Sequence, residues 1–388
     1  MLCYGCMTSI NEDDVFCPYC GFKLGTEPTE IFHLSPGTEL SSRYTLGKVI
    51  GCGGFGVTYI GWDSIAEKKV AIKEYFPNEF ATRVTGKPDL TVFSGSKGMA
   101  FRDGLSKFVL EARKLTEFTN IEGIVKIYDC FEENQTAYIV MEYLEGETLE
   151  ERITREGKIE SSEAIALLLP IMNALDKVHA DGIIHRDIAP DNIFITKDGK
   201  TKLLDFGAAR NAQLIVEESR TVIVKKGYSP EEQYASRSPQ TSATDVYAMA
   251  AIFYRVLTGK YPPDALERRL FFIKNNKDML VSISKEGVNV PAHVEKAILN
   301  ALQIGMDDRT QTMSKFVEEL TTAPVKKSAL VKNNNVEKRI VSAPNGTKYD
   351  KDSKKRLFIV LGIIAVIFVI YIIVMCSLLF KKSDNMRN

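Results

Sequence analysis

The sequence predicts an α+β protein with two lobes, which a small cysteine-containing segment precedes and an uncharged segment follows. Residues 44–60 alternate like β-strands around a glycine-rich turn, whereas residues 246–257 form an almost wholly apolar stretch of helical length. The chain has 388 residues, which leaves room for one lobed domain of about 250–300 residues and smaller flanking modules.

The glycine-rich turn lies between two predicted strands. Arg43–Ile50 reads as a strand that enters Gly51–Gly56, and Val57–Ile60 reads as a second strand. The G-x-G-x-x-G spacing alone is weak, because dinucleotide-binding folds use a similar one before a helix. A strand on both sides instead predicts a hairpin whose backbone amides can cover phosphate groups.

Two charged residues are candidates for a phosphate clamp. Lys73 ends the strand-forming sequence Val-Ala-Ile-Lys, and apolar residues recur at helical spacing over residues 101–115. We expect Glu111 on this helix to pair with Lys73, with Glu117 as the alternative. Residues 75–99 between them are rich in Pro and Gly and are predicted to form an inserted loop.

The most informative stretch is His185–Asn192, followed by Asp205-Phe-Gly. The carboxylate of Asp187 can orient a hydroxyl for attack, and Asn192 and Asp205 are oxygen ligands of the kind that phosphate-bound magnesium needs. Asp198-Gly199 between two strand-forming runs predicts a hairpin. This hairpin can bring Asn192 and Asp205 to the same side.

The segment after residue 224 carries a second set of signals. Gly227-Tyr228-Ser-Pro-Glu-Glu232 precedes a predicted apolar helix at Val246–Leu257. The segment resembles the Ala-Pro-Glu motif of protein kinases, and this resemblance implies that Glu232 is a structural acid that forms an ion pair with Arg309.

From about Tyr44 to Leu320 the chain resembles bacterial Hanks-type serine/threonine protein kinases, through GGFGVTY, VAIKEYFP, HRDIAPDN and GYSPEEQY. The resemblance implies the two-lobed protein kinase fold, Mg-ATP as phosphate donor, protein hydroxyls as acceptors, and autophosphorylation in a homodimer. It implies Asp187 as catalytic base, Lys73 and Glu111 as phosphate clamp, and Asn192 and Asp205 as magnesium ligands. The nucleotide-binding residues that it implies are Ile50, Gly51, Gly53, Gly56, Ala71, Lys73, Glu142, Leu144, Asn192 and Asp205.

One position departs from this family pattern. Ala189 stands where serine/threonine kinases carry a lysine that neutralises the γ-phosphate, and its loss predicts a much slower transfer. Our hypothesis is that Lys225, seven residues before Glu232, supplies the missing cation, with Lys226 as second choice. An ordinary solvated lysine is the alternative for Lys225. For the whole chain, the alternative is an ATP-binding pseudokinase scaffold.

Four of the seven cysteines form two CxxC pairs, Cys3/Cys6 and Cys17/Cys20. This spacing can place four thiolates around one zinc ion, and the second pair resembles a zinc-ribbon knuckle. We prefer structural Zn²⁺ over disulfides, because a cytoplasmic chain keeps its thiols reduced, and over a redox CxxC. Residues 1–40 lack a clustered basic patch, so we expect no nucleic-acid partner.

The C-terminal part predicts a membrane anchor. Residues 324–356 contain ten Lys or Arg against three acids, and the next 24 residues carry no charge. As a helix these 24 residues would be about 36 Å long, enough to cross a bilayer. The basic linker places the N-terminal bulk in the cytoplasm of a single-pass membrane protein. The expected order is a zinc ribbon (1–25), a kinase domain (44–321), a basic juxtamembrane linker (322–356), a transmembrane helix (357–380) and a short extracytoplasmic tail (381–388).

Overall fold

The computed structural model describes residues 1–28, 30–54, 56–205, 225–235 and 238–322. Its strands are β1 (Glu39–Leu40), β2 (Tyr44–Gly53), β3 (Gly56–Asp63), β4 (Lys68–Tyr75), β5 (Ala81–Arg83), β6 (Leu90–Val92), β7 (Ile127–Glu133), β8 (Thr136–Glu142), β9 (Gly146–Thr148), β10 (Ile193–Thr196) and β11 (Thr201–Leu203). Its helices are α1 (Ser96–Thr116), α2 (Leu149–Glu156), α3 (Ser161–Ala180), α5 (Ser242–Thr258), α6 (Ala265–Asn275), α7 (Ala292–Ala301) and α8 (Met313–Thr321).

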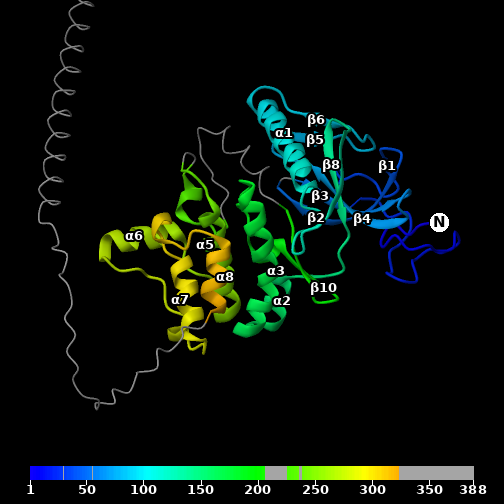
Figure 1. Cartoon of the computed structure of the whole chain (residues 1–388). Helices are drawn as coiled ribbons and strands as arrows, with labels where there is room; N and C mark the ends of the chain where they lie inside the picture. Colours follow the sequence, from blue (N-terminus) through cyan, green and yellow to red (C-terminus); the bar gives the residue numbers. More distant parts are fainter. Residues whose placement is uncertain (29, 55, 206–224, 236–237, 323–388) are drawn as a thin grey trace, which may run out of the picture. The chain divides into compact units, whose positions relative to one another are not determined.

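The N-terminal lobe is built on one antiparallel sheet with the strand order β1-β2-β3-β4-β8-β7. Helix α1 packs along this sheet against β7 and β8 (Figure 1). The predicted helical spacing explains the packing, since Phe101, Phe108, Ala112 and Leu115 all lie buried on one side of α1. The strand and helix predictions for this lobe are confirmed.

The predicted inserted loop at residues 75–99 is wrong in part. It contains a short hairpin of β5 and β6, in which Ala81 pairs with Val92, and helix α1 already begins at Ser96. Three residues per strand are too few for an alternating pattern to be visible in the sequence. The hairpin carries a buried arginine, Arg83, into the lobe.

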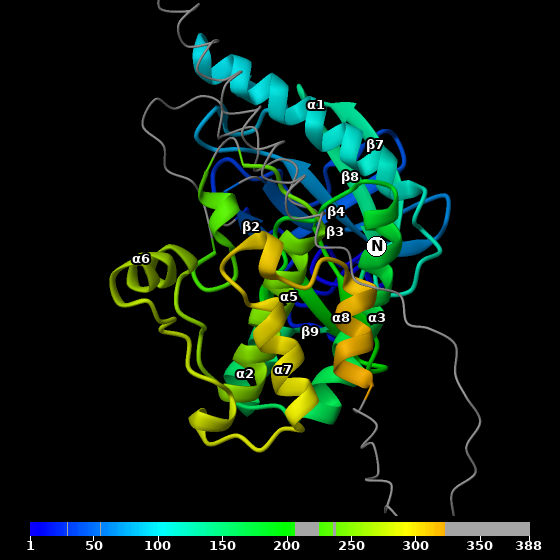
Figure 2. The same ribbon diagram turned by 60° about the vertical axis from the view of Figure 1, so that its left-hand side comes forward.

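The C-terminal lobe is helical and centres on α5. Fifteen of the seventeen residues of α5 are buried, as expected for a helix that is apolar on every side. Thr241 caps its N-terminus, and Gly259 ends it in the left-handed conformation. Helices α3, α7 and α8 pack against α5 (Figure 2).

A small sheet with the strand order β11-β10-β9 begins directly after the connection that follows β8. Strands β10 and β11 pair around Asp198-Gly199, where Gly199 has φ +80°, so the predicted hairpin is confirmed. Leu203 of β11 donates to the Gly123 carbonyl and accepts from the Val125 amide, at 2.8 and 3.1 Å. These bonds tie the small sheet to the segment before β7.

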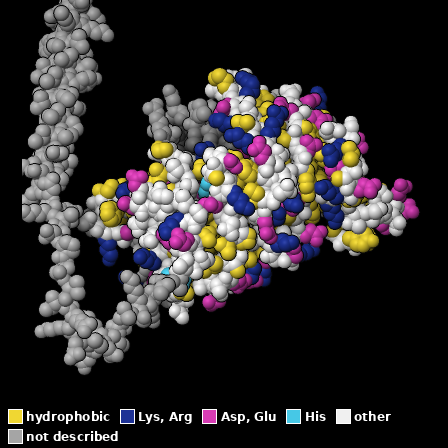
Figure 3. Space-filling model, viewed as in Figure 1, with side chains coloured by type: hydrophobic (Ala, Val, Ile, Leu, Met, Phe, Trp, Pro, Cys, Tyr) yellow, Lys and Arg dark blue, Asp and Glu magenta, His cyan; other side chains and the backbone are white. Residues whose placement is uncertain are grey.

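Lys and Arg side chains are interspersed with Asp and Glu on the face shown in Figure 3, in keeping with the net charge of zero. Within the described part of the chain, no helix is both long and apolar enough to span a membrane. The predicted linker and transmembrane helix, residues 322–380, lie outside the described residues except for residue 322.

Candidate active site

The glycine-rich turn connects β2 and β3 as predicted, with Gly53 opposite Gly56 at the end of the ladder. A Cβ atom at Gly53 would meet nothing within 4 Å, and at Gly51 the nearest atom would be 3.8 Å away. The fold itself therefore does not require glycine at these two positions. A side chain at Gly56 would instead approach the Glu74 carbonyl oxygen to 2.3 Å, so this glycine is required by packing.

Lys73 lies on β4, between Thr58 of β3 and Ile139 of β8. Its Nζ atom is 2.7 Å from Oδ2 of Asp205, so two predicted site residues from different lobes meet. Glu111 lies in the C-terminal third of α1 and is half-buried, whereas its alternative Glu117 is exposed and follows the last residue of this helix. The pairing of Lys73 with Glu111 stays a prediction.

The remaining predicted nucleotide contacts lie on neighbouring strands. Ile50 is exposed on β2, and Ala71 of β4 is buried opposite Met141 of β8. Glu142 ends β8, and its carboxylate accepts from the Lys126 amide at 2.8 Å and pairs with Lys202 at 2.9 Å. Leu144 follows in the half-buried connection to β9.

The loop at residues 185–192, hereafter the catalytic loop, is held by one buried carboxylate. Asp245 of α5 accepts from the backbone amides of His185 and Arg186, both at 2.8 Å, and from the His179 ring at 2.7 Å. Burial alone would raise the pKa of the Asp245 carboxyl. The hydrogen bond from His179 acts in the opposite direction, and the pKa lies below its usual range. Arg186 has φ +68°, a conformation that the Asp245 contact stabilises.

Asp187 and Asn192 face each other across this loop. Asn192 Nδ2 donates to both the carbonyl and Oδ2 of Asp187, each at 2.7 Å. Because its amide nitrogen is used in this way, Oδ1 is the atom with which Asn192 can bind a cation. The Leu204 amide also donates to the Asn192 carbonyl at 2.8 Å, which brings Asp205 to the same side of the site.

Lys225 extends from the segment before Glu232 into the catalytic loop. Its Nζ atom is 3.5 Å from Oδ1 of Asp187 and 2.6 Å from Oδ1 of Asp191. A turn positions it, in which the Ser229 amide donates to the Lys225 carbonyl at 3.0 Å. The neighbouring Lys226 is exposed.

The predicted ion pair between Glu232 and Arg309 is confirmed. The two side chains are 2.8 Å apart and almost completely buried. The next residue, Gln233, donates to the Arg186 carbonyl at 2.7 Å. This segment is therefore anchored both to the end of the C-terminal lobe and to the catalytic loop.

The motifs that form this site match one known protein family. The family described as "Protein kinase domain" matches residues 44–328. The chain belongs to the protein kinase family.

Bacterial kinases are among the proteins to which the chain is similar. The chain is 33% identical over 302 residues to a protein of Clostridium acetobutylicum named as a probable serine/threonine-protein kinase, and 31% identical over 288 residues to the serine/threonine-protein kinase PrkC of Bacillus subtilis. These matches cover 77% and 74% of this chain but 41% of each relative. A solved structure titled PpkA-294 apo form has 30% identity and a TM-score of 0.67, with 74% of this chain and 99% of that chain covered.

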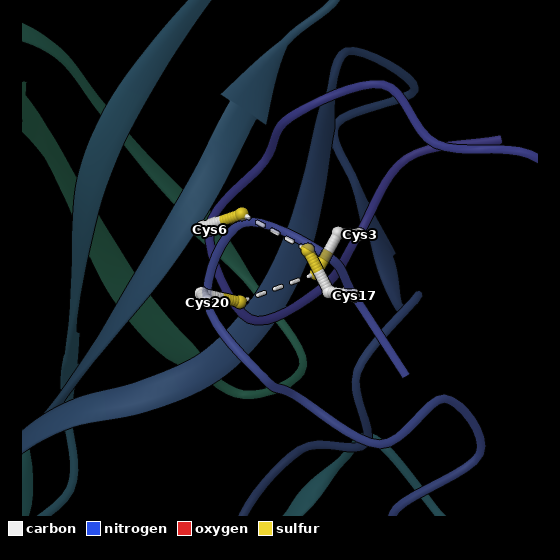
Figure 4. Close-up of side chains that lie close together, drawn as sticks. All are labelled: Cys3, Cys6, Cys17 and Cys20. Atoms are coloured by element: carbon white, nitrogen blue, oxygen red, sulfur yellow. Dashed lines mark hydrogen bonds between the residues drawn. The ribbon is translucent and has the colours of Figure 1, made fainter. Parts of the chain in front are cut away.

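Ahead of the kinase domain, the four predicted metal ligands lie together (Figure 4). The sulfur atoms of Cys3, Cys6, Cys17 and Cys20 are all within 4.8 Å of one another, with Cys3 and Cys20 at 3.7 Å and Cys6 and Cys17 at 3.8 Å. Sulfurs around a tetrahedral zinc at about 2.3 Å are separated by about 3.8 Å, so this donor set fits the ion.

The surroundings of these cysteines shift the pKa values of Cys3 and Cys17 in opposite directions. Burial raises the pKa of the Cys3 thiol to about 12. Although burial opposes it, the amides of Cys20 and Tyr19 lower the pKa of the Cys17 thiol to about 7. A divalent cation would stabilise all four thiolates.

Some features of the kinase site were missed by the sequence predictions. Asp191 is a second partner of Lys225, and Gln233 ties its segment to the catalytic loop. Both are contacts between residues more than thirty positions apart, for which one sequence holds no local signal. Phe206 and Gly207 lie outside the described residues, as do residues 208–224.

Proposed function

We propose that this chain is a serine/threonine protein kinase that transfers the γ-phosphate of Mg-ATP to protein hydroxyls, including its own. The observation that carries the proposal is a pair of linked contact groups. Lys73 meets Asp205, Asn192 and Lys225 both meet Asp187, and the Leu204–Asn192 backbone hydrogen bond joins the two groups. The named relatives support serine/threonine specificity. They are more than twice as long as the matched part, so substrates and partners of the whole protein are part of the proposal.

Asp187 takes the role of the base. Its carboxylate is fixed by Asn192 and lies beside Lys225, and in this place it accepts the proton of the attacking hydroxyl and orients that hydroxyl toward the phosphate. Lys73 binds the α- and β-phosphates, with Glu111 fixing its position. The bare backbone at Gly51 and Gly53 lets the amides of the turn approach these phosphates.

The rest of the nucleotide is bound between the strands. The backbone groups of residues 142–144 contact the adenine, and Ile50 and Ala71 of the N-terminal sheet pack against the base. Asn192 and Asp205 supply the oxygen donors for Mg²⁺, which when bound neutralises charge on the phosphates.

Lys225 replaces the lysine that is missing at Ala189. The Ala189 side chain is buried in the core of the C-terminal lobe. Lys225, in the segment before Glu232, instead reaches the carboxylate of Asp187. A cation at this place stabilises the charge that develops on the transferred phosphate. Pairing with Asp191 keeps the lysine in the site.

The proposal is tested by phosphate transfer from labelled ATP with Mg²⁺, using the full chain and its Asp187→Asn variant. We expect the wild-type protein to label itself or a general acceptor protein. The variant should lose about 10³-fold or more in rate, because the base and its charge are removed together. Binding of ATP without any transfer by the wild-type protein would instead establish the pseudokinase scaffold.

We also propose a structural Zn²⁺ at the four N-terminal cysteines. Metal analysis of the purified chain should give one zinc per molecule, and about none in a Cys3→Ser/Cys6→Ser variant. The nearly tetrahedral spacing of the sulfurs supports this proposal. Equal zinc content in the two proteins would contradict it.

For the whole chain we propose a single-pass membrane protein with a cytoplasmic kinase domain, anchored by residues 357–380 behind a basic linker. The expected boundaries are those given above, with the kinase domain at residues 44–321. Cell fractionation tests this proposal. The wild-type chain should be recovered with membranes, and a chain that ends at residue 356 should not.

A further inference from the structure

The N-terminal module at residues 1–25, hereafter the ribbon, consists of two similar knuckles. In each, the first cysteine amide donates to the carbonyl five residues later, from Cys3 to Thr8 and from Cys17 to Phe22, both at 2.9 Å. The carbonyl of that cysteine accepts from the amide four residues later, which belongs to Met7 in one knuckle and to Gly21 in the other.

These two equivalent residues share a left-handed backbone, with φ +55° at Met7 and +70° at Gly21. Glycine adopts this conformation without strain, whereas methionine rarely does. The strained residue is also the buried one, since Met7 is 1% exposed. The side chain of Met7 must therefore serve a contact that Gly21 does not.

That contact is with strand β2. A Cβ atom at Gly47 would lie 2.4 Å from Cε of Met7 and 2.3 Å from the carbonyl oxygen of Tyr4. The same carbonyl accepts a hydrogen bond from the Lys48 amide at 2.8 Å. Only a glycine at position 47 lets the knuckle lie so close to the strand.

The docking site lies at an irregularity in β2. The pairs of β2 with β3 shift register between Leu46 and Val49, and the pairs with β1 end at Thr45. The ribbon therefore supplies the hydrogen-bond acceptor of the Lys48 amide, which is the Tyr4 carbonyl. Gly51, the first residue of the phosphate-binding turn, is only three residues further along β2.

The metal ligands alternate with the docking residues. In the order Cys3-Tyr4-Gly5-Cys6-Met7, the contact residues lie within and directly after the first CxxC pair. Bound metal would hold the knuckle closed and so keep the Tyr4 carbonyl and the Met7 side chain in their positions.

We propose that Tyr4 and Met7 are positioning residues for ATP, which couple zinc occupancy of the ribbon to the placement of the glycine turn. This inference rests on the proposed kinase function and on the zinc site. Loss of zinc releases β2 at Lys48 and lowers the affinity for ATP. The phosphate-transfer step, which depends on the catalytic loop, changes little.

The test is equilibrium binding of a fluorescent ATP analogue to the full chain, before and after zinc removal. A zinc-selective chelator strips the metal and is removed, and Mg²⁺ is restored before titration. We expect the Kd to rise about fivefold or more, a typical allosteric coupling, and to recover when Zn²⁺ is added back. In kinetic assays KM for ATP should rise by a similar factor, with kcat within about twofold.

Met7→Gly is the matched variant, because it keeps the left-handed backbone and deletes the contact. It should bind zinc like the wild type and have a raised Kd, and zinc removal should then change that Kd by a smaller factor than in the wild type, because only the Tyr4–Lys48 hydrogen bond is left to couple the two sites. Tyr19→Ser, on the exposed part of the second knuckle, should retain the wild-type response. A wild-type Kd that does not respond to zinc would overturn the inference and leave the kinase proposal intact. Absence of nucleotide binding by the zinc-loaded wild type would overturn both.

Discussion

At the residue scale, two buried histidines differ in whether their ring nitrogens have hydrogen-bond partners. His185 is fully buried, with Nε2 at 3.0 Å from the Leu204 carbonyl and Nδ1 accepting from the Asp187 amide at 3.2 Å. His33 is 6% exposed, and neither ring nitrogen has a hydrogen-bond partner among the described residues. Burial lowers the pKa of both side chains, so both are neutral in the folded protein at pH 7.

These histidines predict a loss of stability in mild acid. Below a pH of about 6.5 the unfolded chain binds protons that the folded chain does not, because the folded pKa values are lowered. Stability should therefore fall as pH drops from 7.5 toward 5.5, and melting temperatures measured across this range will show it. His33→Leu should give a flatter slope than the wild type, because it removes one of the two groups that the folded protein keeps neutral. If stability falls with pH at the same rate in the wild type and in His33→Leu, His33 does not contribute to the acid sensitivity.

Site residues in local motifs could be predicted from the sequence, whereas a contact with a distant segment could not. Asp187, Asn192 and Asp205 were predicted because motif spacing and the Asp198-Gly199 turn act locally. The role of Asp191 as a partner of Lys225 was not predicted, because it depends on how a distant segment folds back over the catalytic loop.

At the scale of elements, the β5–β6 hairpin is the main surprise. Arg83 of β5 forms a buried ion pair with Glu74 of β4, directly after Lys73. Tyr59 and Tyr138 donate to the same carboxylate at 3.1 and 2.9 Å. The Pro and Gly content of residues 75–99 correctly predicted turns. The sequence could not show that an arginine between those turns completes the core of the lobe.

Removing one partner of this pair should destabilise the N-terminal lobe strongly. Arg83→Met leaves the Glu74 charge buried without its counter-ion, which typically costs about 3–5 kcal/mol. Lys87→Met, an exposed charge in the turn of the same hairpin, should change stability by less than about 0.5 kcal/mol. Denaturant unfolding of both variants measures the difference. Similar losses for the two would show that Arg83 is not a structural residue.

At the scale of the whole molecule, the site exists only where separate parts of the chain meet. Lys73 comes from the N-terminal sheet, Asp205 follows β11, and Lys225 comes from a segment anchored to Arg309 by Glu232. The order of these parts was predictable, because each motif is continuous in the sequence. The docking of the ribbon on β2 was not, since it depends on the shapes of two folded surfaces.

The proposed kinase site depends on the relocation of one cation, from position 189 to Lys225. Ala189 cannot neutralise the phosphate, and among the described residues the fold brings Lys225 to Asp187. Lys225→Arg should retain most of the activity, since it keeps the charge. Lys226→Met should behave like the wild type, because that neighbour is exposed.

The most direct measurement is the single-turnover rate of phosphate transfer by Lys225→Met at saturating Mg-ATP. We predict a loss of about 10²- to 10³-fold, as for removal of one group that stabilises transition-state charge, with little change in ATP affinity. A Lys225→Met enzyme that transfers phosphate at the wild-type rate would contradict the claim.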